Sequence, residues 1–222
     1  MTERSAAFRD FIFHQPARGS GYRANVDALH LAEFAGQGGS AAKRAFDLGA
    51  GAGAVGLTLL HQRRAAHVVF VEVDPEAARL AARNIQESGW SNRGEVALGE
   101  VGAVSFARAG EADLVVCNPP YIDPSRGRVP PEPRRARARS GSLTTFVEAA
   151  RRFAGKRSRI CFVYPANDLA TLVATLRAAG IEPKRLRMVH PRSGRPARIV
   201  LVEGRAGKIG GLVVEPPLIE LP

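Results

Sequence analysis

Short apolar runs alternate with helix-like segments along most of the chain, and this alternation constrains the fold more than any other feature. His67–Val73 is β-branched and unbroken, as expected of a strand buried on both faces. Pro75–Ser88 begins with proline, gathers its apolar residues on one face and is followed by Gly89, which predicts a helix. The pattern predicts an α/β fold with a doubly wound, mostly parallel sheet. We expect strands at Ala45–Leu48, His67–Val73, Glu95–Leu98, Asp113–Cys117, Arg159–Tyr164, Leu186–Val189 and Arg198–Glu203, and helices at Val55–His61, Pro75–Ser88, Ser142–Ala154 and Asp168–Ala179.

The C-terminal part of the chain departs from this alternation. Only a turn, His190–Ala197, separates the last two expected strands, which leaves no room for a crossover helix. These strands should therefore run antiparallel to each other. The tail Ile209–Pro222 is apolar and contains proline, and we expect it to pack back on the body.

Composition excludes several classes of protein. With 222 residues, 45% of them hydrophobic and 24% charged, the chain can bury one sizeable core and is not disordered. Its longest uncharged stretch, Leu48–Leu60, is too short and too glycine-rich to span a bilayer, and we see no signal peptide. Cys117 and Cys161 stand in apolar runs, which predicts buried free thiols in a cytoplasmic protein and excludes a zinc site. The five histidines show no metal spacing either.

The net charge of +11 is concentrated in two segments. Ile122–Gly141 carries +4 and Glu182–Lys208 carries +6, mostly as arginine. Arginine binds two phosphate oxygens at once and stacks on bases, so the pattern favours a nucleic-acid partner. A generally basic surface is the alternative. The candidate contacts are Arg126, Arg128, Arg134, Arg135, Arg137, Arg139, Arg192 and Arg195.

A glycine-rich run from Phe46 to Gly53 leaves the first expected strand and opens a helix. Glycines at this point let the backbone approach a ligand closely, although they could serve only strand–helix packing. Asp47 is poorly placed for a pyrophosphate and well placed for the α-ammonium of S-adenosylmethionine, which favours this methyl donor over NAD. Glu72 ends the next strand, where ribose hydroxyls are bound, and Glu100 follows the third. The backbone candidates are Gly49, Gly51 and Gly53.

The turn Asn118-Pro119-Pro120-Tyr121 ends the fourth expected strand, at the sheet edge where such folds bind ligands. The amine of an adenine is a poor nucleophile because its lone pair is delocalised into the ring. If the Asn118 side chain and the Pro119 carbonyl accept its two N–H bonds, the nitrogen becomes more tetrahedral and more nucleophilic. Tyr121 can stack on the flat target. The turn therefore predicts methylation of a planar amine.

On these motifs the sequence resembles class I S-adenosylmethionine-dependent methyltransferases of the NPPY group. More narrowly, the segment Gln15–Ala35 and the ending Ala197–Leu221 resemble the bacterial tRNA1(Val) adenine-N(6)-methyltransferase family. The resemblance implies a Rossmann-like seven-stranded sheet with an antiparallel terminal hairpin. It assigns Asp47 and the glycines to the methionine part of the donor, Glu72 to its ribose and Glu100 to its adenine. It also implies that Asn118 to Tyr121 receive the target base and that Asn118 contributes to the donor site as well.

The resemblance divides the chain into a capping segment over residues 1–44, a methyltransferase domain over 45–208 and a tail over 209–222. In the capping segment, Tyr22 and Asp27 would close over the donor, although Asp27 could equally be an ordinary helix-start residue. The run Ala138-Arg139-Ser140-Gly141 departs from the expected Ala-Arg-His-Glu, which puts the substrate in question more than the catalysis.

The expected substrate is therefore tRNA, acted on beside the anticodon by a monomer or small homo-oligomer that needs no metal and no membrane. Other planar nitrogens stay open as acceptors: a guanine 2-amino group, a glutamine side-chain amide, or adenine in DNA. A non-catalytic RNA-binding module is the alternative of a different class.

Overall fold

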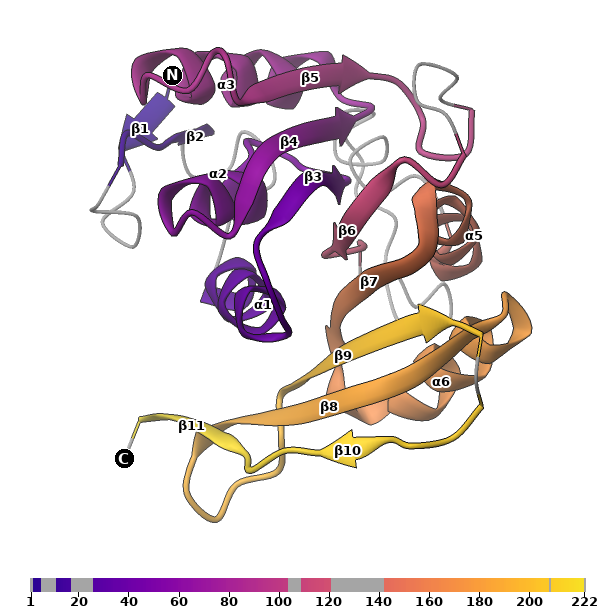
Figure 1. Cartoon of the computed structure of the whole chain (residues 1–222). Coiled ribbons are helices and arrows are strands. Elements are labelled where there is room, and N and C mark those ends of the chain that lie inside the picture. The colour runs from indigo at the N-terminus through magenta and orange to yellow at the C-terminus, as the bar shows by residue number, and fades with distance from the viewer. Residues whose placement is uncertain are drawn as a thin grey trace.

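The computed structural model of the chain describes residues 2–4, 11–16, 26–103, 109–120, 142–207 and 209–221. Its centre is one sheet with the strand order β10-β8-β9-β7-β6-β3-β4-β5, and β11 also pairs with β8 (Figure 1). The main strands are β3 (Ala42–Leu48), β4 (Ala65–Glu72), β5 (Gly94–Leu98), β6 (Ala112–Cys117), β7 (Ala154–Pro165), β8 (Ile181–Arg192) and β9 (Ile199–Ala206). β5, β4, β3, β6 and β7 are parallel, and β9 runs antiparallel between β7 and β8. This topology confirms the predicted doubly wound sheet and its antiparallel hairpin.

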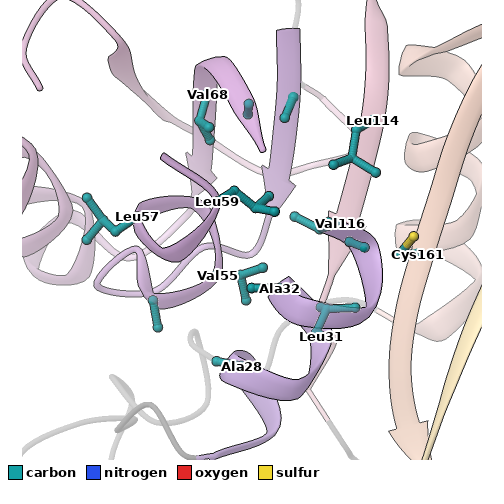
Figure 2. Close-up of a cluster of buried hydrophobic side chains, with 14 of the residues drawn as sticks. Ala28, Leu31, Ala32, Val55, Leu57, Leu59, Val68, Leu114, Val116 and Cys161 are labelled. Atoms are coloured by element: carbon teal, nitrogen blue, oxygen red, sulfur yellow. The ribbon is translucent and has the colours of Figure 1, made fainter. Parts of the chain in front are cut away.

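Helices cover both faces of the sheet. α1 (Val26–Gln37), α2 (Ala54–His61) and α3 (Pro75–Glu87) contribute to one buried cluster, while α5 (Leu143–Phe153) and α6 (Leu169–Ala178) contribute to the other. Figure 2 shows part of the first cluster, where Leu31 and Ala32 of α1 lie near Val55 of α2 and Val116 of β6. Ser142 accepts a hydrogen bond from the Thr145 amide and caps the start of α5.

The strands are apolar without a break because both of their faces are covered. Along β4, Val68 and Phe70 belong to the first cluster, whereas Val69 and Val71 belong to the second. Both cysteines, Cys117 and Cys161, are buried free thiols, as predicted. Burial raises the pKa of the Cys161 thiol to about 12, so this thiol is not a nucleophile at neutral pH.

Two parts of the chain extend beyond the expected elements. β8 continues to Arg192, so the connection to β9 is shorter than the predicted turn His190–Ala197. The tail forms β10 (Val213–Val214) and β11 (Leu218–Leu221), which pair parallel to β8 and widen the sheet to nine strands. At the other end of the chain, β1 (Thr2–Arg4) and β2 (His14–Pro16) form a separate small antiparallel sheet. Within the described ranges, no helix is long and apolar enough to cross a membrane.

Candidate methyl-donor and acceptor site

The loop between β3 and α2 has a backbone that favours glycine at three positions. Gly49, Gly51 and Gly53 have φ values of 70°, 57° and 93°, which lie in the left-handed region. The amides of Gly49 and Ala50 both donate to the Val71 carbonyl, at 2.9 and 3.0 Å, and so tie the loop to β4. The loop is thus a tight turn at the carboxyl edge of the sheet.

The glycines of this loop differ in what surrounds them. A Cβ at Gly56 would lie 2.3 Å from Phe70 Cε1, so this glycine serves the packing of α2 on β4. A Cβ at Gly53 would lie 3.2 Å from both Leu57 and Phe70, which is also packing. At Gly51 a Cβ would meet no atom of the described residues within 4 Å. A Cβ at Gly49 would lie 3.0 Å from Phe146 Cε1. Packing therefore explains three of these glycines, and among the described residues the space beside Gly51 is open for a ligand.

Asp47 is the penultimate residue of β3 and is buried. Its Oδ2 accepts a hydrogen bond of 2.9 Å from the Gly56 amide at the start of α2. Burial raises the pKa of this carboxyl to about 7, the Gly56 amide opposes that rise, and the charge of Glu72 adds to it. Asp47 is therefore a carboxyl whose charge no cationic side chain of the described residues compensates.

Glu72 lies at the end of β4, next to the glycine loop. Its Oε2 accepts from the Gly51 amide at 2.7 Å, and its Oε1 accepts from the amides of Val73 and Asp74 at 2.9 and 2.8 Å. Burial raises the pKa of Glu72, and these amide hydrogen bonds oppose the rise. Because a carboxylate has about four acceptor positions, Glu72 can hold the glycine loop and still accept from a ribose hydroxyl.

The acceptor turn leaves the strand next to the glycine loop. β3 and β6 are neighbours, and Leu48 pairs with Cys117, so Gly49 and Asn118 leave adjacent strands at the same edge. Asn118 is half-buried, Pro119 is buried and Pro120 is half-buried. On the other side, Glu100 is exposed just after β5. The fold therefore brings the expected donor and acceptor residues together along one edge.

The N-terminal candidates have a mixed outcome. Asp27 is buried in the first turn of α1, rather than before the helix, and forms an ion pair of 2.6 Å with Arg198. Tyr22 lies outside the described residues, as do Tyr121 and the Ser140-Gly141 departure. The donor role of Asp27 stays a prediction.

Several arginines of the basic segment Glu182–Lys208, which contains the β8–β9 hairpin, form ion pairs within the fold. Arg185 pairs with Glu203 and Glu215, and Arg187 pairs with Glu215. In contrast, Arg192 and Arg195 are exposed, and no ion pair involves them in the part of the segment that the structure describes. They lie at the end of β8 and in the connection to β9, at the same carboxyl edge as Asn118. The other candidate arginines, at 126, 128, 134, 135, 137 and 139, lie outside the described residues.

Sequence reasoning missed Asn84, which braces the glycine loop. This fully buried side chain donates to the carbonyls of Ala52 and His14, both at 2.9 Å, and accepts from the His14 amide at 2.7 Å. It therefore joins α3, β2 and the loop. A signal was present, because Asn84 precedes the buried Ile85 on the apolar side of an otherwise amphipathic helix.

The site fits a cationic ligand. Asp47 and Glu72 are buried acids, and no cationic side chain of the described residues forms an ion pair with either of them. An ammonium beside Asp47 would supply the missing charge, and the open space at Gly51 admits a ligand to the loop. Within the described ranges, no group of His, Cys, Asp and Glu could hold a metal ion.

Comparisons with known proteins agree with this geometry. Residues 28–129 match the family model of the methyltransferase small domain. A protein from Enterobacter sp. (strain 638) named tRNA1(Val) (adenine(37)-N6)-methyltransferase is 35% identical over 60% of this chain and 55% of its own length. A protein of the same name from Tolumonas auensis is 32% identical over 72% of this chain and 68% of its own. The match thus spans just over half of the first relative and about two thirds of the second.

A solved structure shows the same fold. The crystal structure of a predicted O-methyltransferase from Agrobacterium tumefaciens covers 88% of this chain and 88% of its own, with a TM-score of 0.69 and 24% sequence identity. This likeness concerns the fold and leaves the acceptor of the methyl group to be argued from the site.

Proposed function

We propose a reaction for this chain, which belongs to the tRNA1(Val) adenine-N6-methyltransferase family of class I S-adenosylmethionine-dependent methyltransferases. The proposed reaction is methyl transfer to the N6 amine of an adenine in tRNA, beside the anticodon. One observation carries this proposal: the glycine loop and the Asn118-Pro119-Pro120 turn follow the carboxyl ends of the neighbouring parallel strands β3 and β6.

In this reaction the chain holds and orients two partners. S-Adenosylmethionine, when bound, supplies an electrophilic methyl group. Asp47 attracts its α-ammonium, and Glu72 accepts from its ribose hydroxyls while it holds the Gly51 amide. The Asn118 side-chain oxygen and the Pro119 carbonyl accept the two N–H bonds of the target amine. No strong base is required, because the proton leaves the nitrogen after the transfer.

Methyl transfer into candidate acceptors tests this function directly. Bulk tRNA, bulk rRNA, DNA and total protein from a strain that lacks this gene are incubated with the purified chain and tritiated S-adenosylmethionine. We expect label in tRNA, and nucleoside analysis should identify N6-methyladenosine at a single site. Label confined to rRNA, DNA or protein would assign the chain another planar nitrogen, and no label anywhere would contradict the enzymatic proposal.

Charge reversal at the hairpin tests the nucleic-acid interface. Arg192→Glu combined with Arg195→Glu should weaken tRNA binding, because two exposed cations at the carboxyl edge would be lost. If both contact phosphate, the slope of log K against log salt should fall by roughly 1.4 to 1.8. Filter binding at several salt concentrations measures both effects.

A matched control has the same change of charge elsewhere. Arg151 and Arg157 are exposed residues at the end of α5 and near the start of β7, at the amino edge of the sheet, whereas the site lies at its carboxyl edge. Arg151→Glu with Arg157→Glu should leave the salt slope nearly unchanged. Equal effects of the two double variants would mean that the hairpin arginines act only through net charge.

A further inference from the structure

The fold leaves one buried polar side chain of β2 without a partner. Gln15 is only 2% exposed, and its Oε1 has no hydrogen-bond partner among the described residues. Buried amide oxygens are almost always hydrogen-bonded, because burial removes the water that would otherwise donate to them. An unpartnered oxygen at this depth therefore indicates a partner that comes from outside the chain.

β2 is joined to the glycine loop at the residue just before Gln15. Asn84 Nδ2 donates to the carbonyls of His14 and Ala52, both at 2.9 Å, so these two oxygens lie no more than twice that distance apart. Ala52 belongs to the glycine loop and follows Gly51, the position with open space around it. Gln15 thus stands where β2 meets the loop.

The segment that leads to Gln15 runs along α2 toward the same loop. The ring of Phe11 lies 5.7 Å from the ring of His61, the last residue of α2, whereas α2 begins at Ala54, just after the loop. Four steps of extended chain cover about 13 Å, and a helix of eight residues is about 12 Å long. The chain therefore reaches the first turn of α2 at Gln15, and Figure 1 shows β2 beside α2 and α3.

The side chain of Gln15 lies on the face of β2 that packs against α2 and the loop. Phe13 and Gln15 are buried, whereas His14 between them is half-buried. Because side chains alternate along an extended chain, Phe13 and Gln15 share one face. Phe13 belongs to the buried cluster that contains Leu57 of α2, and Ala52 of the loop packs against that cluster. The amide of Gln15 is therefore directed to the loop side of β2.

The amino-acid end of S-adenosylmethionine carries two opposite charges, and the residues described so far serve only one of them. Asp47 and Glu72 attract an ammonium or hydroxyl groups, but both repel a carboxylate. The backbone amides of the glycine loop and of the first turn of α2 are mostly used within the protein. Those that already donate belong to Gly49, Ala50, Gly51, Gly53 and Gly56. The α-carboxylate of the donor thus needs a further hydrogen-bond donor at the loop.

We propose that Gln15 binds the amino-acid end of the methyl donor, an inference that rests on the proposed function. The amide nitrogen of Gln15 donates to the α-carboxylate, and its oxygen accepts from the α-ammonium. A primary amide suits this zwitterion because it offers a donor and an acceptor side by side and carries no charge. Asp47 then supplies the charge for the ammonium, while Gln15 recognises the carboxylate without competing for it.

Gln15→Met tests this contact, because methionine has nearly the same length but no amide. We expect the Kd for S-adenosylhomocysteine to rise about tenfold, since hydrogen bonds to two charged groups are lost. The Kd for 5′-methylthioadenosine, which keeps the adenosine and the thioether but lacks the amino-acid end, should stay nearly unchanged. Calorimetry measures both constants, and the KM for S-adenosylmethionine should rise in step with the first of them.

Thermal unfolding separates this role from a structural one. Because the Gln15 oxygen has no partner in the free protein, Gln15→Met should leave the Tm unchanged or raise it. Gln86→Met is the matched control, since Gln86 is exposed on the neighbouring helix α3, and it should change neither affinity. An unchanged Kd for S-adenosylhomocysteine in Gln15→Met, or equal losses of affinity for the two ligands, would overturn the role of Gln15. Failure of the unaltered chain to bind S-adenosylhomocysteine would instead overturn the proposed function, and with it this inference.

Discussion

Asn118→Ala should lower kcat for tRNA methylation by about 10²- to 10³-fold, while the Kd for S-adenosylhomocysteine stays within a few-fold. The first effect follows because alanine removes an acceptor that stabilises the developing tetrahedral nitrogen, and one such preorganised hydrogen bond typically contributes a factor of this size. The second follows because Asn118 stands after β6, whereas the residues proposed to hold the donor, Asp47 and Glu72, stand on β3 and β4. Single-turnover methyl transfer and calorimetry measure the two effects separately.

The control for this variant is Asn118→Asp, which keeps an acceptor oxygen at the same place. It should retain more activity than the alanine variant, since the target N–H bond still has a partner. Cys117→Ala tests whether the end of β6 is merely sensitive to change, because this buried thiol has no part in the chemistry. Full activity of Asn118→Ala would remove the turn from the mechanism.

The fold could be predicted because most strands are covered on both faces. β4 and β6 are buried apolar runs, and such runs are recognisable without any knowledge of their neighbours. β8 was predicted too short because polar residues interrupt its apolar pattern. Arg185 stands just before the predicted strand Leu186–Val189 and hides its continuation, yet it lies within β8 and pairs with Glu215 of the tail. The pattern of a strand is hidden when its polar residues find partners far away in sequence.

The contrast between local patterns and distant partners also explains which polar contacts could be predicted from the sequence. Asp47, Gly51 and Glu72 belong to local motifs at strand ends. Asp47 accepts from Gly56, 9 positions away, and Glu72 accepts from Gly51, 21 positions away. The contact between His30 and Glu220 joins two segments 190 positions apart, so neither segment alone predicts it. The net charge of the segment Glu182–Lys208 was counted as evidence for a nucleic-acid partner, yet Arg185, Arg187 and Arg198 form ion pairs within the fold. Arg192 and Arg195, the two arginines of this segment that were named as candidate contacts, are exposed and form no ion pair within the described residues.

Asp47→Asn should weaken the binding of S-adenosylhomocysteine by about 10- to 100-fold and should also stabilise the fold at pH 8. Binding weakens because a charge-assisted contact to the α-ammonium contributes about 1.5–3 kcal/mol. Stability rises because the buried carboxylate is costly in the free protein. The asparagine can still accept from the Gly56 amide, so the start of α2 keeps its hydrogen bond.

The pH dependence distinguishes this effect from general repacking. The pKa of Asp47 is raised from 3.8 to about 7, so between these values the folded state holds a proton that the unfolded state has released. Its destabilising contribution therefore grows as the pH rises from about 4 to 7 and reaches at most about 4 kcal/mol, at 1.36 kcal/mol per pKa unit. Thermal unfolding should show a large gain for Asp47→Asn at pH 8 and a small one at pH 5.

The affinity for S-adenosylhomocysteine should also depend on the ionisation of Asp47. In the unaltered chain, binding needs the carboxylate and should weaken as the pH falls through 7, whereas in Asp47→Asn this pH dependence should disappear. Asp113→Asn is the control, because this exposed aspartate on β6 accepts from the Lys43 and Arg44 amides and lies away from the loop. It should gain no stability at pH 8. If Asp47→Asn bound S-adenosylhomocysteine as tightly as the unaltered chain, the cation-binding role of this buried acid would be wrong, and its cost to the fold would have no functional reason.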